Sequence, residues 1–142
     1  MSYSLGFTQA IAVVLFVTDK VQQGIYDFVP TKALSDQLGI ARPSAVKILQ
    51  ALSRAGIIDT REGAKGGVRL ARAATKITVA DIFSAVEQDR PLFRSDLNFA
   101  VSGSKPSKAS AAIASLLNDA EAAMKKSLAT QSISNLMQKI NR

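Results

Sequence analysis

The chain has 142 residues, 47% of them hydrophobic, and a formal net charge of +7. This is the size of one domain, or of one domain with an extension, and it provides enough apolar residues to bury a core. The sequence has no cysteine and no histidine, so it lacks disulfides, cysteine-ligated clusters and the commonest general base and metal ligand at neutral pH. We therefore expect no enzyme activity, no metal site and no cofactor.

The first predicted element is a helix from Leu5 to about Gln22. Its segment from Ala10 to Val17 is apolar throughout, but it is too short to span a bilayer and no basic segment precedes it. We predict neither a signal peptide nor membrane association, and we expect a cytoplasmic protein. A helix that is apolar on most sides needs more than one packing partner, so we expect it to contact a second subunit as well as its own domain.

A helix-turn-helix is predicted next. Thr31 is a suitable N-cap for a helix that continues to Leu38, and Gly39 stands where a helix commonly ends in the left-handed conformation. A second helix is expected to begin at Pro43, because proline is tolerated in a first turn, and to end near Ala55.

The second helix has the pattern of a DNA-recognition helix. Short polar and basic side chains on one face are the types that reach phosphates and base edges in the major groove. An ordinary solvated amphipathic helix has the same pattern, so the neighbouring segments decide between the two interpretations. The two faces are Ala45, Ile48, Leu49 and Leu52 toward the domain, and Ser44, Lys47, Gln50, Ala51 and Arg54 away from it.

A basic, glycine-rich hairpin follows directly. Ile57 and Ile58 form an apolar strand that leads into the tip, and the chain returns at residues 68–70. Glycine supplies the positive φ that a tight hairpin needs. We interpret this hairpin as the wing of a winged helix-turn-helix, with Lys65 placed to enter or flank a minor groove.

Positive charge is concentrated in this region. Residues 31–76 contain nine Lys or Arg and three Asp or Glu, a net +6 of the chain's +7. Such a local excess indicates a polyanionic partner, and we expect double-stranded DNA. The residues predicted to contact DNA are Thr31, Arg42, Pro43, Ser44, Lys47, Gln50, Arg54, Arg61, Lys65, Gly66 and Gly67.

A further helix is predicted from Val79 to Gln88, with Thr78 as its cap and Asp81 completing a capping box. Residues 89–110 contain two prolines, a glycine and several serines, so they are predicted to be a loop or a partly ordered connection. The apolar residues of this connection should pack against another part of the protein. They either fill the space at a hinge or form a site for an unknown small-molecule or protein effector. These residues are Leu92, Phe93, Leu97, Phe99 and Val101.

Helical order returns in the C-terminal part. Apolar residues recur at three-and-four spacing along one long helix, and a short last helix is predicted at residues 133–140 with Ser132 as its cap. The long helix either folds back onto its own domain or pairs with a second copy in a homodimer, and the second arrangement is the usual one. The residues predicted to hold the dimer are Ile113, Leu116, Leu117, Ala120 and Met124.

These elements predict a mostly α protein with a small β-hairpin wing. The winged helix-turn-helix DNA-binding domain is expected at residues 1–88, the connection at 89–110 and the dimerisation helices at 111–142.

The wing and the residues after it resemble a known family. Residues 65–72 (Lys-Gly-Gly-Val-Arg-Leu-Ala-Arg), followed by residues 77–82 and 85–87, are similar to the signature of the Rrf2 family of bacterial winged-helix transcription regulators. Residues 132–136 resemble the family's closing helix, so the resemblance covers nearly the whole chain. One difference is Val68, where the family commonly has an aromatic residue.

A second difference concerns iron. Many members of this family ligate an iron-sulfur cluster through three cysteines before the long helix, and residues 89–108 contain none. The remaining resemblance is to the cysteine-free, YwnA-like branch, whose entry to the recognition helix is similar to Arg42-Pro43 here. An iron-sulfur sensor is therefore not expected.

The resemblance implies a dimeric, sequence-specific transcription regulator, and a repressor if its operator overlaps a promoter. The alternative is a basic, non-specific nucleic-acid-binding or architectural protein that recognises shape rather than sequence. An enzyme is disfavoured because no pair of carboxylates has a spacing typical of general acid-base chemistry.

Overall fold

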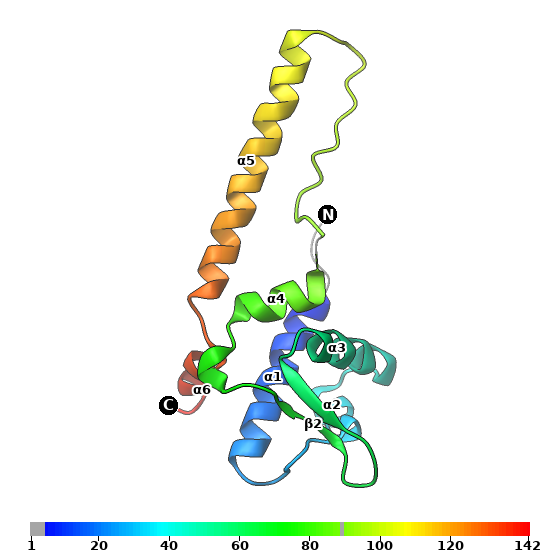
Figure 1. Ribbon diagram of the computed structural model, residues 1–142, viewed down its shortest axis with the longest axis vertical. Coiled ribbons are helices and arrows are strands. Elements are labelled where there is room, and N and C mark those ends of the chain that lie inside the picture. Colours follow the sequence, from blue (N-terminus) through cyan, green and yellow to red (C-terminus); the bar gives the residue numbers. More distant parts are fainter. Residues whose placement is uncertain (1–4, 89) are drawn as a thin grey trace.

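The computed structural model describes residues 5–88 and 90–142. It has two parts: a winged head, formed by residues 5–88 and 130–142, and a stalk, formed by residues 90–129 (Figure 1). The stalk contains α5 (Ser104–Ala129) and the connection that leads to it. The elements of the head are α1 (Leu5–Gln22), α2 (Thr31–Leu38), α3 (Arg42–Arg54), β1 (Ile58–Arg61), β2 (Gly67–Leu70), the 3₁₀ turn η1 (Ala74–Lys76), α4 (Val79–Glu87) and α6 (Ile133–Ile140).

α1 is the central helix of the head, and its predicted bounds are confirmed. It contacts α2, α3, α4, α6 and β2, and Ala10, Val13, Val14 and Val17 on it are fully buried. By length and composition alone α1 could cross a membrane. In this fold its apolar surface is instead covered by five other elements, and α1 forms the core of the head.

The helix-turn-helix forms where it was predicted, with a correction at each helix start. Gly39 ends α2 in the left-handed region at φ 65°. Thr31 is the first residue of α2 and not its cap, because Pro30 occupies the cap position with φ −63° and ψ 143°, values that the proline ring favours. α3 begins at Arg42, one residue before Pro43, which lies in its first turn.

The wing is an antiparallel hairpin in which Asp59 faces Arg69 and Thr60 faces Val68. Val29 forms an isolated β-bridge to the wing, since it exchanges two backbone hydrogen bonds of 2.7 and 2.9 Å with Val68. Gly67 fits this close approach because a Cβ there would lie 2.2 Å from the Val29 carbonyl oxygen. The wing is therefore joined to the segment that precedes α2.

Capping boxes begin both α4 and α6. The Thr78 hydroxyl accepts from the Asp81 backbone N–H at 3.1 Å, and the Thr78 N–H donates to the Asp81 carboxylate at 2.9 Å. Ser132 and Asn135 form the same arrangement at the start of α6. The two predicted caps are confirmed, and an antiparallel bridge joins Thr78 to Ser132, which holds the last helix against the head.

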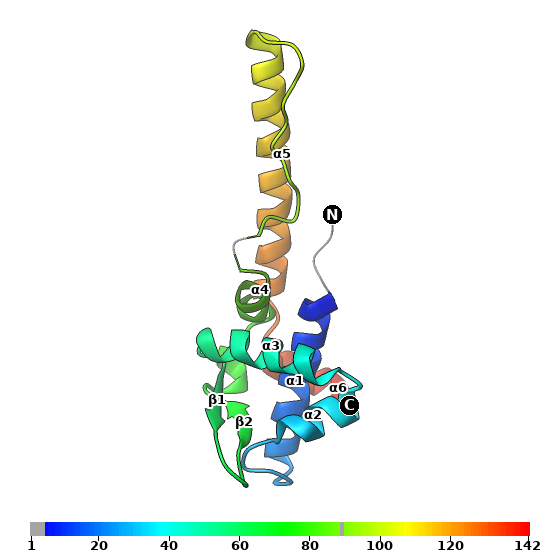
Figure 2. The same ribbon diagram turned by 90° about the vertical axis from the view of Figure 1, so that its right-hand side faces the viewer.

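α5 begins at Ser104, so the connection is shorter than the predicted range 89–110. Pro106 does not prevent helix formation because it lies in the first turn, where its missing N–H would have no intrahelical partner. α5 contacts α4 at its head-side end and otherwise extends away from the head, with the connection running beside it (Figures 1 and 2). None of the α5 residues is buried, so the helix does not fold back onto its own domain.

Candidate DNA-binding surface

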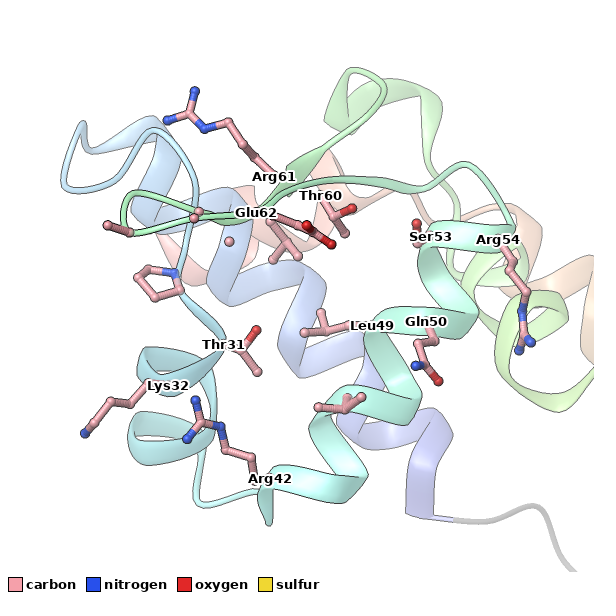
Figure 3. A pocket seen from close by; sticks show the side chains of 17 residues that line it. Thr31, Lys32, Arg42, Leu49, Gln50, Ser53, Arg54, Thr60, Arg61 and Glu62 are labelled. Carbon is pink, nitrogen blue, oxygen red and sulfur yellow. The ribbon is translucent and has the colours of Figure 1, made fainter.

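A groove of about 940 Å³ lies between α3 and the wing (Figure 3). The buried side chains of Leu49 and Val68 lie at its base, and polar side chains from α3 and β1 form its walls. Four cationic residues contribute to the lining of this groove, although the Arg61 side chain points away from α3 (Figure 3), and among the described residues Glu62 alone contributes a carboxylate. The cationic residues are Lys32, Arg42, Arg54 and Arg61. The groove therefore has the charge and shape expected for a polyanion site.

The outer face of α3 presents Lys47, Gln50 and Arg54, and all three are exposed. Lys47 and Ser44 do not line the groove beside the wing. They line a second hollow of about 580 Å³ between α3, the start of α1 and the end of α4. Arg54 lines both hollows, so it lies where the outer face of α3 meets the two sides.

Ala51 was predicted on the exposed face of the recognition helix, and this prediction is wrong. Ala51 is buried, with 9% of its surface exposed, because α4 packs against that flank of α3. The exposed face of α3 is consequently narrower than the sequence pattern suggested. Its exposed side chains lie toward the wing, as Gln50 does, or line the second hollow, as Ser44 and Lys47 do.

Two hydrogen bonds within the hairpin hold the wing tip. The Gly66 N–H donates to the Gly63 carbonyl at 3.0 Å, and the Arg61 guanidinium donates to the Lys65 carbonyl at 3.2 Å. A Cβ on Gly66 would lie 2.2 Å from the Arg61 carbonyl oxygen, so this position needs glycine. The Lys65 side chain is exposed at the tip, whereas that of Arg61 points away from α3 (Figure 3).

The structure brings most of the predicted contact residues to one surface. Pro43 and Lys65 are exposed and line neither of the two hollows described. The predicted residues that line the groove are Thr31, Arg42, Gln50, Arg54, Arg61, Gly66 and Gly67.

Sequence reasoning missed several residues of the groove. Val46 and Ser53 lie on the same flank of α3 as Arg42, and helical spacing could have identified them. Thr60 faces Val68 across the hairpin, so the two side chains share one face of the sheet. Lys32 lies in the first turn of α2, where its ammonium contacts the Asp36 carboxylate at 2.7 Å.

The apolar residues of the connection were expected to pack against something, and within the described residues four of them are only partly covered. Phe93, Leu97, Phe99 and Val101 are 40% to 66% exposed. An ion pair lies among them: the Arg94 guanidinium donates to the Asp96 carboxylate at 2.7 Å, and this hydrogen bond is the main cause of the lowered pKa of Asp96.

Comparison with known proteins gives the family of this fold and surface. A family model described as "Rrf2: Iron-dependent Transcriptional regulator" matches residues 3–139. A candidate HTH-type transcriptional regulator of Synechocystis sp., slr0846, is 34% identical over 70 residues, which are 49% of this chain and 48% of that protein. The matches span about a third to a half of the length of the first curated relatives.

Solved structures show the same fold at low sequence identity. IscR of T. potens is 17% identical with a TM-score of 0.71, over 99% of this chain and 88% of its own. A candidate transcriptional regulator from Lactobacillus plantarum is 17% identical with a TM-score of 0.78, over 97% of this chain and 91% of its own. The predicted fold, mostly helical with a two-stranded wing and a long C-terminal helix, is confirmed.

The family description names iron, and the donor atoms of this chain do not fit it. Iron centres in proteins are held mainly by cysteine, histidine and carboxylate groups. The sequence contains neither cysteine nor histidine. Within residues 5–88 and 90–142 no three carboxylate side chains are grouped closely enough to hold a metal ion.

Proposed function

We propose that this chain, which belongs to the Rrf2 family of DNA-binding transcription regulators, is a sequence-specific dimeric repressor that acts without an iron-sulfur cluster. The observation that best supports this proposal is the cationic groove between α3 and the wing, with polar side chains on the exposed face of α3 beside it. The absence of thiols and imidazoles from the sequence supports the part of the proposal that concerns iron.

In the proposed complex α3 enters the major groove. A helix of 13 residues is about 20 Å long, so its first turns and its last turn contact different parts of the duplex. Lys47 and Gln50 face the base edges, since lysine pairs with guanine and glutamine with adenine. Arg42 and Arg54, at the two ends of α3, contact phosphates, and Lys65 at the wing tip reaches the adjacent minor groove.

The proposed dimer forms through α5. The described residues leave its apolar stripe only partly covered: Ile113 is 37% exposed and Leu116 is 67% exposed. A two-fold interface between two copies of α5 would bury this stripe and place two heads on one face of the duplex. Half-sites about 34 Å apart, one turn of DNA, would then match the symmetry of the protein.

Repression follows when this dimer covers a promoter, because polymerase and dimer then compete for the same duplex. The site of action is the cytoplasm, where bacterial DNA lies. The competing proposal is a basic architectural protein, and it predicts a different ratio of affinities for operator and random DNA.

The test starts from fragmented genomic DNA captured by the purified full-length protein and then sequenced. Enriched fragments should share a two-fold symmetric motif, and Kd for that motif should be at least about 1,000-fold below Kd for random duplex at the same salt concentration. Transcription in vitro from an enriched promoter should fall when the protein is added. Uniform capture and a ratio near one would indicate the architectural protein instead.

A further inference from the structure

The aromatic ring of Phe28 contacts an arginine side chain from each strand of the wing. The Cζ atoms of Arg61 and Arg69 lie 4.3 and 4.5 Å from the centroid of the Phe28 ring, and Phe28 is only 9% exposed. Asp27 lies beside it, with carboxylate oxygens 4.0 Å from Nη1 of Arg61 and 3.7 Å from Nη1 of Arg69. One arginine comes from β1 and the other from β2, so a single ring and a single carboxylate contact both strands.

We propose that Asp27 and Phe28 position the wing against α3 and thereby determine how strongly the protein discriminates its operator from other DNA. We name Asp27, Phe28, Arg61 and Arg69 the arginine clamp. The inference rests on the proposed sequence-specific binding, and it adds positioning residues that lie outside the DNA-contacting face of α3.

The clamp is connected to both sides of the groove. On the wing side, the guanidinium of Arg61 that stacks on Phe28 also donates a hydrogen bond to the backbone carbonyl of Lys65. The Phe28 ring is therefore connected to the wing tip through Arg61. On the other side, residues 28 and 29 lead directly into Pro30 and Thr31, which line the groove. The two Val29–Val68 hydrogen bonds fix the backbone between these two contacts. Movement of Phe28 would therefore change the distance between the wing tip and α3.

The clamp also limits indiscriminate binding. Each phosphate contact adds about 0.9 to the slope of log K against log salt and increases affinity for any sequence. While Arg61 and Arg69 are held by the Phe28 ring and the Asp27 carboxylate, they are less available to phosphates. Discrimination is a ratio of affinities, so a device that lowers binding to random DNA raises that ratio.

Phe28→Leu tests the positioning role, because leucine keeps an apolar side chain in the same place but has no ring face for the arginines. We expect the ratio of random-DNA Kd to operator Kd to fall about tenfold, and Phe28→Tyr, which keeps the ring, to restore it. Phe16→Leu is the matched control. Phe16 lies in α1 with the Lys20 ammonium 5.3 Å from its ring. The Phe16→Leu variant therefore loses a similar cation–ring contact away from the wing and should leave the ratio of the two Kd values unchanged.

Asp27→Asn tests the role of the carboxylate, and Asp27 is 72% exposed in its side chain, so this variant keeps the core intact. We expect tighter binding to random DNA and a salt slope steeper by about one to two, because two arginines become available to phosphates. Asp119→Asn in α5 makes the same change in net charge and should leave the slope unchanged.

A measurement without DNA separates this inference from the proposed function. The ring of Phe28 should shift the side-chain proton resonances of Arg61 and Arg69 upfield in NMR spectra of the free protein, and Phe28→Leu should remove the shifts. Their absence from the unaltered protein would overturn the clamp. A high specificity ratio that Phe28→Leu leaves unchanged would overturn the inference but not the proposed function, whereas a ratio near one in the unaltered protein would overturn both.

Discussion

The winged head and the stalk place their apolar residues differently. All the buried hydrophobic side chains found among the described residues lie in the head, where α1 is covered by five other elements. α5 is the longest of the described helices, at 26 residues, and it has no buried residue, although apolar residues recur along it at three-and-four spacing. Helical spacing therefore predicts that a face will be covered, but not whether the same chain covers it.

The largest expected effect is on the stability of the head. Phe83 is 1% exposed, and its ring packs edge-on against Phe7 with centroids 5.2 Å apart. Phe83→Ala should lower the free energy of unfolding by about 3–5 kcal/mol, because it leaves a cavity in a closed core. Chemical denaturation of the purified variant measures this change.

The stalk provides the control for that prediction. Phe99 in the connection is 41% exposed, so Phe99→Ala should change the free energy of unfolding by no more than about 0.5 kcal/mol. Equal losses for Phe83→Ala and Phe99→Ala would contradict the division of the molecule into a self-sufficient head and a stalk without its own core.

The second prediction concerns assembly. The unaltered protein should sediment as a dimer of about 30 kDa, twice the 15.1 kDa of one chain, because the described residues leave the apolar stripe of α5 partly exposed. Leu117→Asp places a charge in that stripe and should give a monomer with a folded head. Ser115→Asp adds the same charge on the opposite side of the helix and should remain dimeric. If the unaltered protein is monomeric at micromolar concentration, dimerisation through the apolar stripe of α5 is refuted.

Local signals in the sequence predicted much of the head. Gly39 ends α2, and Thr78 with Asp81 begins α4, because each of these features depends on residues within one turn of each other. The wing was predictable for the same reason, since its tip is made by glycines close together in the chain. Local chemistry predicted both α3 and the wing, and seven of the residues that line the groove between them were among the predicted contacts.

Features that depend on distant residues were not predictable. Ala51 has the spacing of an exposed position, but α4 covers it from more than 25 residues away along the chain. Phe28 gives no sign in the sequence that it meets Arg61 and Arg69, because that contact exists only once Val29 pairs with Val68. The start of α5 was misplaced since the prolines and serines before it are as compatible with a first helical turn as with a loop.

The two ends of α3 are expected to contribute differently to DNA binding. Lys47 lies early on the outer face of α3, whereas Arg54 lies at its end between the two hollows. Lys47→Ala should weaken operator binding by about 1–3 kcal/mol and random-DNA binding by less, while Arg54→Ala should weaken both equally. Binding titrations on the two DNAs measure these losses, with Lys139→Ala on α6 as a control for the lost charge. Equal losses for Lys47→Ala and Arg54→Ala on both DNAs would refute the assignment.

The smallest expected effect is that of oxidants, which we expect to leave DNA binding by the protein almost unchanged. With no thiol in the sequence, mild peroxide can modify only methionines, and slowly. Met137 in the head is 4% exposed, and Met124 belongs to the stripe of α5 that the proposed dimer buries, so both should oxidise slowly. We therefore expect operator Kd to stay within about twofold under mild peroxide, since the residues that line the groove include no cysteine or methionine. Titrations with and without peroxide, with Met124→Leu as the variant that lacks the stalk methionine, check this expectation. A rapid, reversible loss of DNA binding in both proteins would mean that the head itself responds to oxidants.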